Sequence, residues 1–137
     1  MTDARQPEET ATRTYRASCH CGLVHFSFRS EAITSGRRCN CSFCARRGNV
    51  VSAVYLPPEA FDAIHGTESL STYRFGDQSM NHHFCSKCGI SPFSVVTSIP
   101  DGYVGAAKPG YCRINLACVH DLDVFSLDIT VLDGKSL

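Results

Sequence analysis

Short segments with alternating or mostly apolar residues dominate the chain, and no long helical period runs through it. Residues 23–29 (LVHFSFR) place Val24, Phe26 and Phe28 on one face, because side chains alternate across a strand. Other short apolar segments are predicted to be strands, at residues 50–56, 70–75, 81–84, 90–97, 103–107, 111–116 and 124–131. Pro92 makes the 90–97 segment an edge or bulged strand, since proline cannot donate to the ladder.

Helical signals are few. Residues 58–65 (PEAFDAIH) predict two turns, with Pro58 at the first helical position and Gly66 as the stop. A turn of helix is also expected after Cys44. The pattern therefore predicts a mainly β protein with its loops at strand ends.

The composition is neither strongly charged nor strongly apolar. Lys and Arg number 13, as do Asp and Glu, so charge gives no reason to expect nucleic acid or an anionic membrane as partner. No apolar run approaches the ~20 residues of a membrane helix. Residues 1–14 are polar and carry no secretory signal, which predicts a disordered tail, one domain over 15–137 and a cytoplasmic, thiol-reducing location.

The nine cysteines point to metal binding, because an odd number of thiols in a reducing compartment does not suit a complete disulfide set. Seven of them fall in three clusters: Cys19 and Cys21; Cys39, Cys41 and Cys44; Cys85 and Cys88. A C-x-x-C turn brings both sulfurs to one ion at about 2.3 Å. Gly89, directly after the third cluster, allows the backbone conformation of such turns.

Seven thiols divide naturally into four and three. A structural zinc takes four ligands, whereas a catalytic zinc keeps a position open. The middle cluster can form a three-ligand site by itself, and the outer clusters then form a four-thiolate site. From spacing alone, the middle site is either an open catalytic centre or a second structural site with an unrecognised fourth ligand. Four arginines flank it and could clamp an anionic ligand or simply be solvated: Arg37, Arg38, Arg46 and Arg47.

The ordered clusters resemble the glutathione-dependent formaldehyde-activating enzyme family, a domain also found in centromere protein V. The residues that carry the resemblance are the runs CHCG at 19–22, CNCSFCAR at 39–46, FCSKCG at 84–89 and NLAC at 115–118. The closing 125–134 stretch is also similar, so the resemblance spans about 15–134.

The resemblance implies a small β-tent fold shared with methionine sulfoxide reductase B, and two zinc ions per chain. It assigns the structural zinc to Cys19, Cys21, Cys85 and Cys88, and the catalytic zinc to Cys39, Cys41 and Cys44. The implied activity is that of a carbon–sulfur lyase, which joins formaldehyde to the thiol of glutathione as S-(hydroxymethyl)glutathione. Arg46 is the candidate for binding a carboxylate of that substrate.

Other functions compete with this interpretation. A non-catalytic zinc domain could bind glutathione or another small thiol, and a structural two-zinc domain could serve interactions only. A methionine sulfoxide reductase would need a free nucleophilic thiol, for which only Cys112 and Cys118 remain. Both are better explained as buried structural thiols, although Cys118 could lie near the open zinc.

Three further polar residues carry alternatives that the sequence leaves open. His82 and His83 could serve as a partner of a zinc ligand or as a proton carrier, or could be half-exposed strand residues. Asn115 could bind a ligand or support a turn.

Overall fold

A computed structural model describes residues 12–136 and confirms a mainly β fold with little helix. The strands are β2 (Arg13–Ser18), β3 (His25–Ser30), β4 (Ser35–Cys39), β5 (Val51–Ser52), β6 (Leu70–Tyr73), β7 (Met80–Cys85), β8 (Phe93–Val96), β9 (Cys112–Ile114) and β10 (Asp128–Leu132). The helices are α1 (Ser42–Arg47) and the single 3-10 turns η1 (Pro58–Ala60), η2 (Thr67–Ser69), η3 (Leu116–Cys118), η4 (Val124–Ser126) and η5 (Gly134–Ser136).

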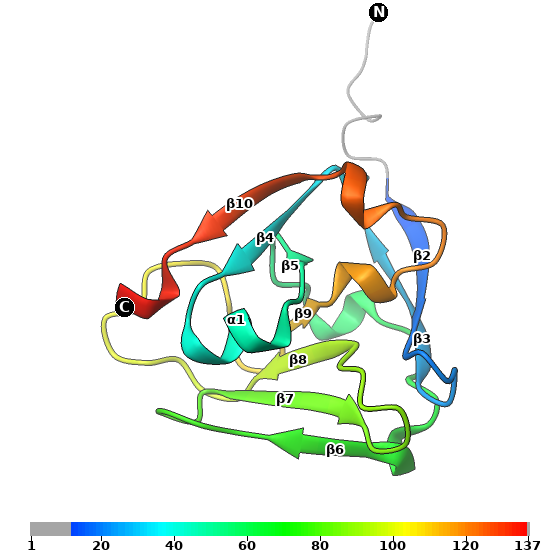
Figure 1. Cartoon of the computed structure of the whole chain (residues 1–137), viewed down its shortest axis with the longest axis horizontal. Helices are drawn as coiled ribbons and strands as arrows, with labels where there is room; N and C mark the ends of the chain where they lie inside the picture. The colour runs from blue at the N-terminus through cyan, green and yellow to red at the C-terminus, as the bar shows by residue number, and fades with distance from the viewer. Residues whose placement is uncertain (1–11, 137) are drawn as a thin grey trace, which may run out of the picture.

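The strands form three small sheets. β2 and β3 make an antiparallel hairpin, and β6, β7, β8 and β9 make an antiparallel sheet in that order. In the third sheet β4 lies between β10, which is parallel to it, and β5, which is antiparallel. Figure 1 shows α1 between this third sheet and the four-stranded sheet, which places the middle cysteine cluster between the two.

The core lies where the hairpin meets the four-stranded sheet. Val24, Phe26 and Phe28 are at most 4% exposed, which confirms the apolar face predicted from alternation. The ring of Phe26 meets that of Phe93 edge-on, with centroids 5.4 Å apart, and Ile114 of β9 is fully buried beside them. This packing fixes the hairpin against the sheet and holds the ends of both in place.

Several predicted elements are shorter than expected. Residues 50–56 form a strand only at Val51–Ser52, and residues 124–131 divide into η4 and β10. Residues 58–65 form only the turn η1, because Phe61 and His65 pair with β3 through isolated bridges instead of continuing a helix. The helix near Cys44 begins at Ser42, before that residue rather than after it.

Other predictions were wrong. Residues 103–107 form no strand; the segment turns on itself, and the Ala107 N–H donates to the Tyr103 hydroxyl at 3.2 Å. β8 is neither an edge strand nor a bulged one, because it lies between β7 and β9. Pro92 precedes the strand, and its carbonyl oxygen accepts from the Asn115 N–H at 2.9 Å, so its missing N–H interrupts no ladder.

Of the predicted tail, residues 1–11 lie outside the described part of the chain. Arg13 and Thr14, at its end, belong to β2. Within residues 12–136, no helix has the length and apolar character needed to cross a membrane.

Candidate metal centres and the adjoining pocket

The outer clusters meet in space as four converging thiols. Their sulfur atoms all lie within 4.8 Å of one another, with Cys21 Sγ 3.6 Å from Cys19 Sγ and 3.7 Å from Cys85 Sγ. Four sulfurs placed tetrahedrally at about 2.3 Å from one zinc ion would be about 3.8 Å apart. The arrangement therefore fits a tetrahedral thiolate site.

This four-thiol cluster is part of a small second core. Cys19 and Cys85 are 2% and 0% exposed and pack with Val24, and the Val24 N–H points at Cys19 Sγ from 3.4 Å. Cys19 follows β2, whereas Cys85 ends β7. Gly89 has φ 82°, the left-handed conformation expected after the C-x-x-C pair. An ion here would tie the hairpin to the four-stranded sheet.

The middle cluster is built by the end of β4 and the start of α1. Cys39 ends the strand, Cys41 is the N-cap of the helix, and Cys44 lies one turn inside it. The Cys44 N–H donates to Cys41 Sγ at 3.3 Å, and the Cys41 N–H points at Cys39 Sγ from 3.5 Å. Within the described part of the chain, only these three residues form this second group of ligand atoms within 4.8 Å of one another.

The proton balance of this three-thiol cluster favours a cation. Burial, and after it the neighbouring thiols of Cys41 and Cys39, raises the pKa of Cys44 to about 12. The raised pKa of Cys44 disfavours its thiolate at neutral pH, and added positive charge would favour it. Metal ligands must be deprotonated, and a divalent ion supplies the charge that allows it. The thiols and their geometry fit a metal ion with an open coordination position.

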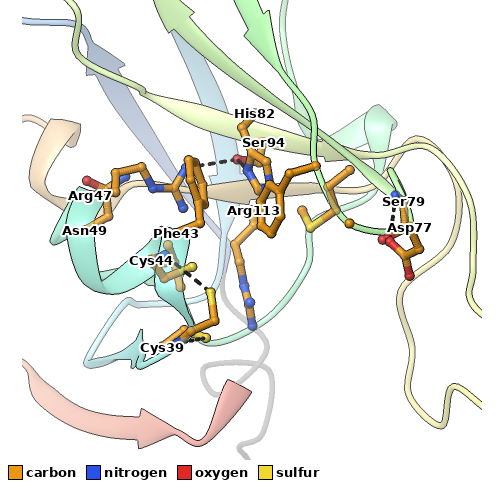
Figure 2. Close-up of a pocket in the computed structure, with 15 residues that line it drawn as sticks. Cys39, Phe43, Cys44, Arg47, Asn49, Asp77, Ser79, His82, Ser94 and Arg113 are labelled. Atoms are coloured by element: carbon orange, nitrogen blue, oxygen red, sulfur yellow. Dashed lines mark hydrogen bonds between the residues drawn. The ribbon is translucent and has the colours of Figure 1, made fainter. Parts of the chain in front are cut away.

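A cavity of about 220 Å³ opens directly onto the three-thiol cluster. It is lined by Cys39, Cys41, Phe43, Cys44, Arg47, Asn49, Val51, Phe75, Gly76, Asp77, Ser79, Met80, His82, Ser94 and Arg113, and we call it the thiol pocket. Figure 2 shows that Arg47 comes from the helix that carries Cys44, while His82, Ser94 and Arg113 come from the facing sheet.

The ionised side chains on the wall of the thiol pocket, apart from its thiols, are the guanidinium groups of Arg47 and Arg113 and the carboxylate of Asp77. Arg47 lies 4.7 Å from the centre of the Phe43 ring and donates to Ser94 Oγ at 3.4 Å. Arg113 lies 4.4 Å from the centre of the Tyr55 ring. The Nε atoms of both arginines are buried without a hydrogen-bond partner among residues 12–136. Burial lowers the pKa of Arg47, yet an arginine remains charged at neutral pH. Both guanidinium groups line the pocket and would attract an anionic group held there.

His82 and Ser94 are buried polar residues of the facing sheet, and they contact each other. The His82 Nδ1 lies 2.9 Å from Ser94 Oγ, and the His82 ring lies 4.4 Å from that of Phe43. Burial first, and then the charge of Arg47 and the nearby His83, lowers the pKa of His82 to about 4. The imidazole is therefore neutral at pH 7. His83 points away, to Thr72 Oγ1 at 2.9 Å, and lines neither the thiol pocket nor the cavity beside it.

A second cavity of about 540 Å³ lies beside the thiol pocket and shares Phe43, Arg47, Asn49 and His82 with it. Arg46 is exposed, lines this neighbouring cavity and donates to Ser42 O at 2.9 Å, so it does not line the thiol pocket. Asn115 supports a turn: its Oδ1 accepts from the Ala117 N–H at 3.1 Å.

The residue that sequence reasoning missed is Arg113, since a lone arginine on a short strand has no local signal. Ser94 was missed for the same reason. Arg37 and Arg38 line neither cavity, which leaves Arg47 as the flanking arginine that faces the thiols.

The two remaining cysteines are buried and protonated. Burial raises the pKa of Cys112 to about 11 and that of Cys118 to about 12. The thiols of Cys19 and Cys88 add to the effect on Cys118, which places it near the four-thiol cluster rather than in the thiol pocket. A protonated buried thiol is a poor nucleophile, which disfavours the methionine sulfoxide reductase hypothesis.

Fold and site define a small mainly β domain with two separate thiol clusters suited to metal, one closed and one beside a basic pocket. The chain belongs to the family described as glutathione-dependent formaldehyde-activating enzyme, which it matches over residues 14–123. It is also similar to a Rhodobacter sphaeroides protein of known crystal structure, with 27% identity over 84% of this chain and 99% of the other and a TM-score of 0.66.

Proposed function

We propose that the chain binds two zinc ions and is a carbon–sulfur lyase that condenses formaldehyde with glutathione. The observation that carries the proposal is the open three-thiol cluster on the wall of a pocket that also holds Arg47 and Arg113. The family supplies the substrates, since glutathione and formaldehyde are in its description. The ligands would be Cys19, Cys21, Cys85 and Cys88 for the structural ion, and Cys39, Cys41 and Cys44 for the catalytic one.

The reaction is an addition without oxidation or reduction. A new bond joins the glutathione sulfur to the formaldehyde carbon, and the carbonyl oxygen receives the proton that the thiol loses. Zinc held at the three thiols would supply Lewis acidity, which lowers the pKa of a bound thiol or polarises a carbonyl.

The residues of the chain would provide binding and electrostatics. Glutathione is anionic, and the guanidinium groups of Arg113 and Arg47 on the pocket wall would attract one of its carboxylates. The same charges favour a thiolate over a thiol in the pocket, because positive charge nearby lowers a thiol pKa. The neutral His82 adds no positive charge, so its contribution is to hold Ser94 and the aromatic wall in place.

Arg46 keeps a separate place in this proposal. The sequence-based hypothesis assigns it a glutathione carboxylate, and its position beside the neighbouring cavity suits only the outer part of a bound tripeptide. Glutathione titrations of Arg46→Gln and Arg113→Gln compare the two positions directly.

The experiment begins with metal analysis. We expect two zinc ions per chain, one of which a chelator removes readily. Calorimetry with glutathione then measures binding, and product formation with formaldehyde is measured against the uncatalysed reaction. Cys44→Ser should keep the fold and abolish the rate above background. If Cys44→Ser catalyses as well as wild type, the lyase proposal fails. Binding without any rate above background would instead identify a non-catalytic glutathione-binding domain.

A further inference from the structure

The residues that follow β10 close one side of the three-thiol cluster. β10 runs parallel to β4, with Leu132 level with Cys39, so the chain leaves the sheet beside the first thiol. Figure 1 shows the C-terminal turn η5 near the loop that joins β4 to α1. These residues lie beyond the 14–123 segment that matches the family, so their role here is not supplied by the match.

Asn40, the residue between Cys39 and Cys41, is held from both sides by this segment. Its Nδ2 donates to Asp133 Oδ1 at 3.0 Å, and its Oδ1 accepts from the Lys135 N–H at 3.0 Å. The Asn40 N–H donates to Leu132 O at 3.1 Å. Three hydrogen bonds therefore fix the peptide that separates two of the three thiols.

Gly134 lies in direct contact with the cluster. A Cβ at this position would overlap the sulfur of Cys39 and would lie 3.4 Å from the Cβ of Cys41. The backbone of Gly134 thus packs where any larger residue would displace the thiol. The absence of a side chain is required by this close approach, since no left-handed φ is involved.

We infer that Asn40, Asp133 and Gly134 act together as a clasp that positions Cys39 and retains the ion of the three-thiol cluster. The inference rests on the proposed metal binding at that cluster. Three ligands hold an ion less firmly than four, so their preorganisation matters more. Residues that orient metal ligands from behind typically change metal affinity about 10–100-fold when they are mutated.

The clasp is tested by an exchange of its two polar side chains. Asn40→Asp alone places two carboxylates together, which breaks the contact to Asp133. The double variant Asn40→Asp with Asp133→Asn restores it, because the new amide donates to the new carboxylate and the Lys135 N–H still has an acceptor. Lys135→Ala is the matched control, since Lys135 contributes to Asn40 only through its backbone.

The measurements are zinc content after gel filtration and the rate of zinc transfer to a chromogenic chelator. We expect two ions in wild type and Lys135→Ala, faster loss of one ion by about tenfold or more in Asn40→Asp, and near wild-type loss in the double variant. Gly134→Ala should retain one ion, at the four-thiol cluster. Thermal unfolding shows whether each variant is folded.

Two failures can be told apart. If wild type holds two ions and Asn40→Asp releases both as slowly as wild type does, the clasp is wrong and the proposed function stands. If wild type itself holds a single ion, the proposed catalytic centre fails and the clasp fails with it. A double variant that loses zinc as fast as Asn40→Asp also overturns the clasp, because the restored hydrogen bonds then have no effect.

Discussion

Cys85→Ser should unfold the domain far more than Cys44→Ser, although each variant removes one proposed zinc ligand. Cys85 is fully buried at the end of β7. Its Sγ lies 3.7 Å from Cys21 Sγ, which in turn lies 3.6 Å from Cys19 Sγ, so the cluster joins β7 to the hairpin. Structural zinc contributes about 10–16 kcal/mol, or roughly 2.5–4 kcal/mol for each of four ligands. That is a large part of the ~5–15 kcal/mol that stabilises a typical domain.

Cys44 should matter much less for stability, since its cluster joins only β4 and the short helix α1. We expect Cys44→Ser to cost less than Cys85→Ser, because it removes the binding free energy of the more weakly held ion and no link between separate sheets. Cys112→Ser is the matched control for a buried thiol without metal, because the new hydroxyl keeps the acceptor Gly110 O that the thiol faces at 3.8 Å.

Urea unfolding followed by circular dichroism, with reductant and zinc present, measures all three variants. A loss of roughly 2.5–4 kcal/mol lowers the midpoint by about 1 M or more, given slopes of about 1–3 kcal/mol per molar urea. If Cys44→Ser lowers the midpoint as far as Cys85→Ser, the division into a structural and a functional cluster is refuted. An effect of Cys85→Ser no larger than that of Cys112→Ser would refute the role of the four-thiol cluster in folding.

The other predictions concern the thiol pocket and its metal. The imidazole of His82 should titrate in NMR spectra with a pKa near 4. Since this lies below the unfolded value of 6.5, the unfolded state binds more protons between the two, and stability should fall as the pH drops through that range; a midpoint near 6.5 would contradict the burial argument. Arg113→Gln should weaken glutathione binding about tenfold or more in calorimetry, as expected for a lost hydrogen bond to a charged group, and more than Arg46→Gln does. Chelator should remove one zinc early with little change in circular dichroism; loss of both ions in a single phase would count against two distinct sites.

The parts of this protein that depend on neighbours in sequence could be predicted from the sequence. Cys39, Cys41 and Cys44 converge because they lie within six positions at the start of one helix, so local geometry brings their sulfurs together. The alternation at residues 23–29 likewise predicted the buried face of β3, since a strand exposes successive side chains to opposite sides.

β4 was not predicted, because its sequence SGRRC has no apolar pattern. It is a strand because β10 and β5 supply hydrogen bonds on either side, and its Gly36 is buried between them. The strand is therefore determined by its partners, which lie far away along the chain.

The sequence by itself determined which cysteines could be metal ligands, since ligand type and short spacing are local properties. Only the tertiary structure decided what surrounds them. It turned Arg113 rather than Arg46 toward the thiols, and it packed Gly134 against Cys39 from about 95 residues further along. Such contacts depend on which distant strands pair and on how separate sheets pack, and no spacing between neighbouring residues encodes them.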